Sequence, residues 1–451
     1  MRLTIIGGGG FRVPQVFEAV ADDDAPVRID EVVLHDVDPA RLRVVSRVLG
    51  RVAQGYAHPP RLIVTQDLDE ALRGADFVFA AVRVGGTGSR VLDERTALDL
   101  GVLGQETTGP GGLAYALRTV PFMVGLARRI ADVAPDAWVI NFTNPAGIVT
   151  EAMRSVLGER VLGICDTPIG LMRRAQRCVA SSSPVASTVA PRFDYVGLNH
   201  LGWLRSLEVD GVDRLPALLG DDTLLHGIEE ARLMGPDWVR ALGALPNEYL
   251  YYYYFTREAT GRIRASDATR GEFLRDQQDR FYTAAEAPGS DALGLWRGSH
   301  AEREATYMAE SRPEGDEGGR QQEDVTGGYH RVALDLMAAI ATDRPATMIL
   351  NVRNGDLVPQ LPDEAVVEVG CVVDGDGVHP WPVAAVEGHM LGLMTQVKAV
   401  EQLTIEAALT GSAELAWKAF ALHPLVDSVA VGRSLLEAYT QAFPDLGRAL
   451  R

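Results

Sequence analysis

The stretch "RLTIIGGGGFRVPQVFEAVAD", residues 2–22, decides the fold class because three structural signals follow one another in it. Its first apolar residues predict a buried strand, its glycine run predicts a tight turn, and the residues from about Pro14 onward predict a helix. Such a turn lets the backbone approach a pyrophosphate, and the start of the helix offers unpaired N–H groups to the phosphates. We therefore expect a dinucleotide to be bound by Gly7, Gly8, Gly9 and Gly10.

Two further apolar segments support an open parallel sheet. "IDEVVLHDVDPARL", residues 29–42, predicts a second strand that ends at Asp36, whose carboxylate is placed to accept hydrogen bonds from the adenosine ribose. The spacing from the glycine run is longer than the usual one of about 20 residues, and Asp36 could instead be a plain turn residue. "ADFVFAAVRVGG", residues 75–86, repeats the pattern of an apolar run followed by glycines. Together these segments predict an α/β fold with a Rossmann-like parallel sheet of the lactate and malate dehydrogenase type.

Length and composition limit the possible functions. A chain of 451 residues with 47% hydrophobic residues predicts two packed domains, which we place at residues 1–190 (dinucleotide binding) and 191–451 (mixed α/β, substrate binding and oligomerisation). The net charge of −18 argues against nucleic acid or an anionic membrane as partner. Three scattered cysteines and the lack of an export signal or spanning segment predict a protein of the reducing cytoplasm.

Polar residues follow several other predicted strands, where open parallel sheets place their ligands. Asn144 ends "AWVINFTNP" (residues 137–145), Cys165 and Asp166 end the strand in "VLGICDTPIGL" (161–171), and Asn199 and His200 lie within the strand-like "FDYVGLNHLGWL" (193–204). A thiolate and an imidazole can share one borderline-soft cation, with substrate oxygens in the remaining positions. Taken singly, the asparagine could cap a turn, and the cysteine and histidine could be ordinary core residues.

The segment "LPNEYLYYYYF", residues 245–255, introduces a possible base. A phenol near cationic groups ionises more readily, so Tyr249 could act as a base, although an aromatic core is the simpler interpretation of the run. Among the arginines, Arg90 and Arg270 are those we select for binding a phosphate, because a guanidinium fork matches its oxygens. Either one could instead pair with a surface carboxylate.

At this point the chain resembles glycoside hydrolase family four, the NAD- and manganese-dependent glycosidases. The resemblance is carried by nine ordered motifs, which are "IIGGGG", "LHDVDPARL", "RVLDERTALDLGVLGQETTGPGGLAYALRTVP", "NFTNPAGIVTEAM", "GICDTPIG", "GLNHLGW", "NEYLYYYY", "TRGEF" and "AVVEVGCVV". It implies that Cys165 and His200 bind the metal and that Tyr249 is the base. It also implies that Asp166 assists as an acid and that Asn144 binds the sugar. By the same resemblance Arg90 and Arg270 hold a 6-phosphate, and Asn199 belongs to the substrate-binding set.

The resemblance implies a reaction that begins with oxidation. NAD takes hydride from sugar C3, Tyr249 removes the acidified C2 proton, the aglycone leaves from C1, water adds, and the hydride returns. The expected substrate is a 6-phospho-β-glucoside. Asp166 looks more like the α-type members and "NFTNPAG" more like the β-type, so a 6-phospho-α-glucosidase or an α-galactosidase of the same family is the alternative. The resemblance also favours a homodimer or homotetramer.

Two hypotheses from other classes remain. A malate- or lactate-type dehydrogenase would share the cofactor domain and the strand-end Asn-Pro, but it would release NADH with each turnover. A nucleotide-sensing protein without catalysis would need neither a metal nor Tyr249. Cleavage of a nitrophenyl 6-phosphoglycoside without stoichiometric NADH distinguishes the glycosidase from both.

Overall fold

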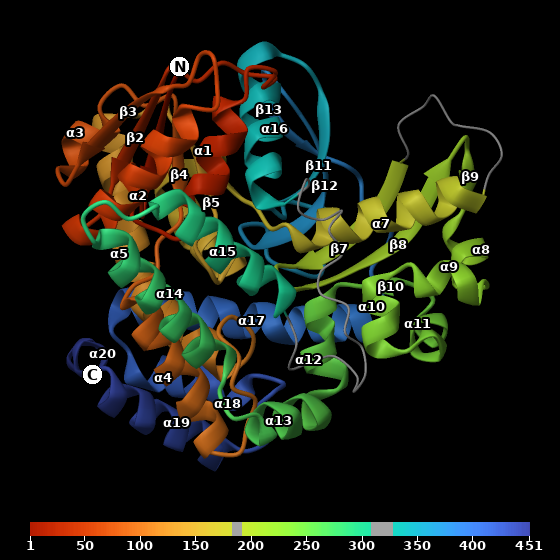
Figure 1. Ribbon diagram of the computed structural model, residues 1–451. Helices are drawn as coiled ribbons and strands as arrows, with labels where there is room; N and C mark the ends of the chain where they lie inside the picture. Colours follow the sequence, from red (N-terminus) through yellow and green to blue (C-terminus); the bar gives the residue numbers. More distant parts are fainter. Residues whose placement is uncertain (183–191, 308–327) are drawn as a thin grey trace.

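The computed structural model describes residues 1–182, 192–307 and 328–451. The predicted boundary between residues 190 and 191 lies outside these ranges and stays a prediction. Within them, no helix is long and apolar enough to cross a membrane. Figure 1 shows the amino-terminal strands at the top of the molecule and the last helices at its base.

The strands within the described ranges join into one thirteen-stranded sheet, in the order β10-β8-β7-β12-β11-β6-β5-β4-β1-β2-β3, with β13 beside β12 and β9 beside β8. Their bounds are β1 Arg2–Ile6, β2 Glu31–His35, β3 Arg61–Thr65, β4 Phe77–Ala80, β5 Trp138–Asn141, β6 Val161–Gly163, β7 Arg192–Leu198, β8 Leu201–Val209, β9 Val212–Asp213, β10 Leu245–Pro246, β11 Ala346–Arg353, β12 Val366–Asp374 and β13 Gly377–Pro380.

The first six strands are parallel, as the apolar runs of the sequence predict. Pairings of β1 with β2 and β4, of β2 with β3, and of β5 with β4 and β6 are all parallel. Strands β1, β2 and β4 are buried almost throughout, which is typical of strands covered by helices on both faces. Their carboxyl ends therefore meet at one edge, and the Rossmann-like fold class is confirmed.

The remaining strands are antiparallel and continue the same sheet. Strand β11 meets β6 only where Asn351 pairs with Gly163. A side chain at Gly163 would lie 2.5 Å from Oγ1 of Thr150 and 2.8 Å from Cβ of Asn351, so this close approach needs glycine. Because the sheet crosses the junction, the two halves share a core instead of meeting through a loose interface.

The helices are α1 Val13–Ala21, α2 Pro39–Ala53, α3 Leu68–Leu72, α4 Gly86–Asp99, α5 Pro110–Val133, α6 Ala146–Leu157, α7 Thr167–Ser182, α8 Leu215–Leu219, α9 Asp222–His226, α10 Glu229–Met234, α11 Pro236–Leu242, α12 Tyr251–Tyr254, α13 Thr256–Ala265, α14 Arg270–Glu286, α15 Ala292–Ala305, α16 Tyr329–Thr342, α17 Gly388–Thr410, α18 Ala413–Leu422, α19 Val429–Ala442 and α20 Pro444–Ala449, with 3-10 turns η1 Gly158–Arg160 and η2 Glu248–Leu250. Helix α17 packs on α5, α14 packs on α4 and α2, and α15 packs on α2. Helices from the second half thus cover elements of the first.

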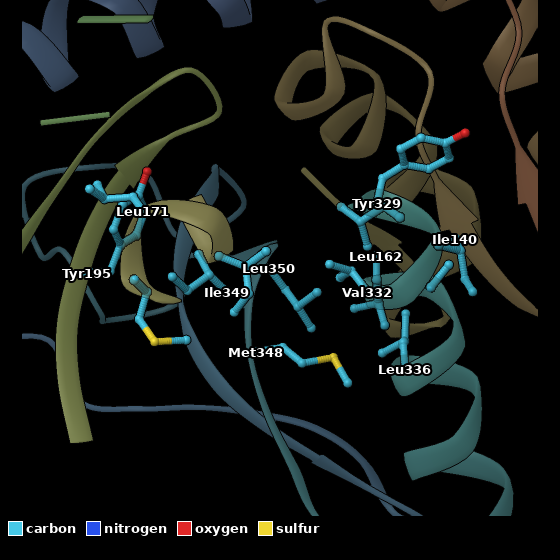
Figure 2. Close-up of a cluster of buried hydrophobic side chains, with 14 of the residues drawn as sticks. Ile140, Leu162, Leu171, Tyr195, Tyr329, Val332, Leu336, Met348, Ile349 and Leu350 are labelled. Carbon is cyan, nitrogen blue, oxygen red and sulfur yellow. The ribbon is translucent and has the colours of Figure 1, made fainter. Parts of the chain in front are cut away.

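The largest hydrophobic cluster is continuous across the two kinds of sheet. Figure 2 shows Ile140 and Leu162 of the parallel strands facing Leu336 of α16, with Met348 and Leu350 of β11 beside them. Each of these side chains is at most 3% exposed. Burial of one such side chain contributes about 1.5–3 kcal/mol, so the cluster fixes the antiparallel strands relative to the parallel ones.

The segment around His200 differs from its prediction as one strand-like stretch. It is a hairpin, in which β7 and β8 flank a turn made by Asn199 and His200. His200 has a φ of 65°, which a strand does not allow. Gly197 and Gly202 face each other across the hairpin, where a side chain on Gly197 would lie 2.3 Å from Cα of Gly202. The apolar residues on both sides are therefore two strands, and the turn carries the polar pair.

Candidate active site

A cavity of about 770 Å³ lies along the carboxyl ends of the parallel strands and is closed by elements of the second half. It is lined by the glycine turn, by the ends of β2, β5 and β6, by the β7–β8 turn and by parts of η2, α14 and α15. The predicted site residues that line it are Gly7, Gly9, Gly10, Asp36, Arg90, Asn144, Cys165, Asp166, His200, Tyr249 and Arg270. Two predicted residues, Gly8 and Asn199, do not line it.

The glycine turn has the shape that a dinucleotide phosphate group requires. Gly7 has a φ of 88°, and a Cβ there would lie 2.3 Å from the carbonyl oxygen of Ala81. A Cβ on Gly8 would lie 2.8 Å from Cβ of Leu34, so this glycine serves packing against β2 and not the cavity wall. The N–H of Gly9 donates to Oδ2 of Asp36 at 2.9 Å, which fixes the turn against the end of β2. Asp36 retains lone pairs for a ribose hydroxyl, so the turn fits the cofactor.

Residues of the second half hold the glycine turn from outside, which the sequence did not reveal. The hydroxyl of Tyr282 on α14 donates to the carbonyl of Gly9 at 2.7 Å. The indole of Trp296 on α15 donates to the carbonyl of Phe11 at 2.9 Å. Both bonds join residues more than 270 positions apart. No local sequence pattern predicts these two hydrogen bonds, because only folding brings α14 and α15 to this loop.

Cys165 and His200 come to the same cavity from opposite halves of the sheet. Nδ1 of His200 lies 3.1 Å from Oγ1 of Thr107, which leaves Nε2 as the ring nitrogen able to bind a cation. Burial lowers the pKa of His200 to about 4, so its ring is neutral at physiological pH, as a metal ligand must be. Burial and the charge of Glu368 raise the pKa of the Cys165 thiol, which a bound cation would oppose.

The donor set fits an open divalent-metal site with few protein ligands. No group of three or more His, Cys, Asp or Glu side chains able to hold a metal occurs among the described residues. Cys165 and His200 therefore leave most positions of a cation to other oxygens. Oδ1 of Asn144 is buried, lines the cavity through its residue and has no hydrogen-bond partner among the described residues. Such an unsatisfied acceptor is costly and indicates a ligand, either a sugar hydroxyl or a cation.

Tyr249 lies directly against the histidine. The two rings stack with centroids 3.7 Å apart and an interplanar angle of 7°. The hydroxyl of Tyr249 lies 3.5 Å from that of Tyr307, which in turn donates to Oε1 of Glu248 at 2.7 Å. Burial and the charge of Glu248 raise the pKa of Tyr249. In the protein alone the phenol keeps its proton, so its use as a base requires positive charge brought by the ligands.

Asp166 follows Cys165 directly and lines the cavity. Its negative charge acts on both predicted metal ligands, since it raises the pKa of Cys165 and opposes the lowering of the pKa of His200. This position is suitable for an acid next to the leaving group, although its role stays a prediction.

The two predicted phosphate-binding arginines have different surroundings. Nε of Arg90 donates to Glu94 at 2.8 Å, and its Nη1 lies 2.7 Å from Oε1 of Glu106, so two carboxylates already compensate its charge. Glu106 also pairs with Arg83. Although burial opposes ionisation, these arginines lower the pKa of Glu106 to about 2. Arg270 donates from Nη1 to Oγ1 of Thr306 at 2.7 Å and from Nη2 to a backbone carbonyl of α15 at 3.0 Å.

Asn199 lies behind the cavity wall. Its Nδ2 donates to Oε1 of Glu368 at 3.2 Å, and the same oxygen accepts from Nδ2 of Asn351 at 3.0 Å. The structure therefore gives this amide a place in holding the hairpin turn, and its part in substrate binding stays a prediction. Glu106 and Thr107 were missed by the sequence reasoning, although they lie within the quoted motif "GVLGQETTGPGG", where a polar run between glycines was the available signal.

A parallel sheet with a cofactor loop, a Cys–His pair and a buried tyrosine at one edge defines a dinucleotide-dependent enzyme with a metal-assisted site. Residues 2–181 match the family model described as family 4 glycosyl hydrolase, and residues 195–426 match that of the family 4 glycosyl hydrolase C-terminal domain. The chain belongs to glycoside hydrolase family 4. The resemblance expected from the sequence is confirmed.

Three relatives show how far the likeness extends. A probable 6-phospho-beta-glucosidase of Bacillus subtilis is 31% identical over 98% of this chain and 96% of its own length. A structure of the 6-phospho-beta-glucosidase of Thermotoga maritima, with NAD and glucose-6-phosphate, is similar with a TM-score of 0.83 at 27% identity and covers 99% of both chains. A 6-phospho-alpha-glucosidase from gut microorganisms, with NAD and Mn2+, is similar with a TM-score of 0.79 at 26% identity over 98% of this chain and 97% of that one.

Proposed function

We propose that this protein hydrolyses 6-phospho-β-glucosides with NAD and a divalent cation, and that this cation is Mn2+. The single observation that carries the proposal is the common cavity of the glycine turn, Cys165, His200 and Tyr249, to which both halves of the chain contribute. Relatives that are named as 6-phospho-glucosidases, or that hold NAD, Mn2+ or glucose-6-phosphate, support it. Family membership favours this glycosidase over the dehydrogenase alternative.

The bound groups would supply a hydride acceptor and a positive charge that acidifies the sugar C–H next to the oxidised carbon. The protein's own residues orient and move protons. Asn144 presents its unpartnered Oδ1 to a sugar hydroxyl. Tyr249, held against His200, takes the C2 proton, and Asp166 supplies a proton to the departing oxygen.

The β anomer is the first choice, and a 6-phospho-α-glucosidase is the second. The curated relative described above is a probable 6-phospho-beta-glucosidase, while one of the two structures is a 6-phospho-alpha-glucosidase. Because the proposed reaction begins with oxidation at C3 and removal of the C2 proton, before the bond at C1 breaks, the residues assigned to these first steps favour neither anomer. The order of preference rests on the likeness of "NFTNPAG" to the β-type.

The remaining expectations concern assembly and compartment. We keep a homodimer or homotetramer as the expected state, and the reducing cytoplasm as the expected location. Cys165, Cys178 and Cys371 are all free thiols, in agreement with a reducing compartment.

The test is turnover of paired chromogenic substrates. Nitrophenyl 6-phospho-β-glucoside, its α anomer and the two unphosphorylated glycosides are compared with NAD and Mn2+, while nitrophenol and NADH are followed separately. We expect the phosphorylated β anomer to be cleaved fastest, without stoichiometric NADH. NADH release equal to substrate consumed would instead select a dehydrogenase, and faster cleavage of the α anomer would select the second candidate.

A further inference from the structure

The cavity holds a guanidinium, that of Arg303, which has no ion-pair partner among the residues that the structure describes. Arg303 lies near the end of α15 and lines the cavity. Its Nε is buried without a hydrogen-bond partner, and no ion pair or hydrogen bond joins its side chain to any residue within the described ranges. Its nearest described aromatic contact is Phe11, whose ring centroid lies 6.0 Å from Cζ. Arg90, by contrast, has carboxylate partners on two sides.

Most of the charges that act on Arg303 are positive, while those of Glu304 and Glu106 are negative. Burial, followed by the charges of Arg12, Arg270 and Arg90, lowers the pKa of Arg303. A guanidinium stays protonated in proteins, so the same forces produce an excess of positive potential at its nitrogens. The backbone carbonyl of Arg303 accepts from Nη2 of Arg270 at 3.0 Å, which keeps the two arginines together. An anion entering the cavity would compensate this charge and satisfy the unpaired donors.

Arg303 lies in the part of the cavity that the substrate sugar would occupy. Tyr307, four residues after Arg303, has its hydroxyl 3.5 Å from that of Tyr249, and Arg270 donates to the backbone carbonyl of Arg303, so these groups share one region. The part of the cavity expected to hold the cofactor ribose, by contrast, contains Asp36 and Arg41, and Arg41 lies over the ring of Tyr282. A phosphate ester could come either from the substrate or from the cofactor pyrophosphate. Phe11 and Arg12, next to the glycine turn, also lie near Arg303, but the bond from Arg270 and the closeness of Tyr307 to Tyr249 favour the substrate.

We propose that Arg303 is a specificity-determining residue that binds the phosphate ester of the substrate, together with Arg270. This inference rests on the proposed function and adds to it a residue that the sequence did not single out. Arg90 then acts within the Glu94–Glu106 network, where its charge is already matched, and not as the principal phosphate ligand.

The test measures binding and does not depend on catalysis. Glucose 6-phosphate, inorganic phosphate, glucose and NAD are titrated by calorimetry into the wild type, Arg303→Gln and Arg303→Lys. The matched control is Arg297→Gln on the same helix, whose side chain is 65% exposed and lies 3.9 Å from Glu18. We expect Arg303→Gln to raise the Kd of glucose 6-phosphate by about 10- to 100-fold, Arg303→Lys to lose less, and NAD and glucose binding to stay unchanged.

A thermal melt provides a second readout. Without ligands, Arg303→Gln should melt at or above the wild-type temperature, because it removes a partly buried charge that has no ion-pair partner among the described residues. Inorganic phosphate should stabilise the wild type and Arg297→Gln more than Arg303→Gln.

Three results separate the hypotheses. Unchanged glucose 6-phosphate binding in Arg303→Gln would overturn the proposal. A loss confined to NAD binding would overturn it as well and assign Arg303 to the cofactor pyrophosphate. Weakened glucose 6-phosphate binding in a protein that cleaves no 6-phosphoglycoside would support the role of Arg303 while refuting the proposed glycosidase activity.

Discussion

The parallel and antiparallel halves of the sheet bring their site residues to the cavity in different ways. The parallel half delivers Gly7, Asp36 and Cys165 directly after strands, at the edge where all its carboxyl ends meet. The second half delivers His200 in a hairpin turn and Tyr249 in a 3-10 turn. The residues of the first half reach the cavity because the carboxyl ends of parallel strands meet at one edge of the sheet. The residues of the second half reach it because their turns pack against the first half.

Cofactor binding and catalysis depend on different kinds of contact. The glycine turn and Asp36 are set by backbone contacts, which suits a cofactor that the protein binds throughout its cycle. His200 and Tyr249 depend on each other, because their rings stack at 3.7 Å. Changes at His200 or Tyr249 should accordingly affect catalysis and leave cofactor binding intact, and changes at the glycine turn should do the reverse.

The largest effect is expected from removing the predicted metal ligands, one in each half. Cys165→Ser and His200→Ala should each lower kcat/KM by about 10³-fold or more, since loss of one electrostatic stabiliser typically costs 10²–10³ and a ligand also holds the cation. Turnover is measured across a Mn2+ titration, with NAD affinity measured in parallel.

Matched substitutions exist for both ligands. Cys178→Ser removes another free thiol, and His423→Ala removes another buried imidazole, but neither residue lines the main cavity. Both controls should retain turnover and Mn2+ affinity. Wild-type activity in Cys165→Ser would remove the cysteine from the site, and undiminished Mn2+ affinity in His200→Ala would do so for the histidine.

Tyr249→Phe should lower turnover by about 10²–10⁴-fold, the usual contribution of a positioned base. The ring remains to stack on His200, so the variant tests the hydroxyl alone. Transient NADH absorbance should still form on mixing with substrate and NAD, while aglycone release and solvent deuterium entry at C2 become slow. Tyr253→Phe is the control, because that ring is outside the main cavity. Fast aglycone release in Tyr249→Phe would place the base elsewhere.

A buried carboxyl in the antiparallel half should make stability depend on pH. Glu368 on β12 accepts from Tyr195, Asn199 and Asn351, and burial raises its pKa from the usual 4.5 to about 7. Between these values the folded state keeps a proton that the unfolded state has lost, so stability falls as pH rises and the loss is complete above about pH 7. At about 1.4 kcal/mol per unit, the loss is at most about 3.5 kcal/mol.

Glu368→Gln tests this dependence, because the amide keeps the shape without titrating. Urea unfolding is measured at several pH values between about 5 and 8. The wild type should lose stability relative to the variant as pH rises through this range. A constant difference between the two proteins would show that Glu368 is ionised throughout.

The same contrast explains how much the sequence could predict. Strands β1, β2 and β4, the glycine turn and the strand-end residues Asn144 and Cys165 follow from hydrophobic runs and their ends, which are local signals. The turn at His200 could not be separated from a strand, because apolar residues continue on both sides of it. Arg303 was not singled out among many arginines, since its lack of an ion-pair partner within the described ranges can be seen only in the folded cavity.

The smallest expected effect concerns the parallel half alone. In Asp36, Oδ2 accepts from the N–H of Gly9 at 2.9 Å and Oδ1 accepts from the N–H of Asp38 at 3.0 Å. Asp36→Asn keeps the size of the side chain but replaces one acceptor by a donor, so one of the two N–H groups loses its partner. We expect the Kd for NAD to rise by about 10-fold, as loss of a hydrogen bond to a charged group costs about 1.5 kcal/mol or more.

Calorimetric titration of NAD measures the affinity, and turnover at saturating NAD provides the internal control. If Asp36 and the glycine turn serve only the cofactor, saturating NAD should restore kcat and leave the Mn2+ dependence unchanged, since Cys165 and His200 do not contact Asp36 through any hydrogen bond within the described residues. A loss of kcat that NAD cannot restore would mean that the glycine turn also positions the sugar. In that case the inference that the glycine turn binds only the cofactor would be wrong.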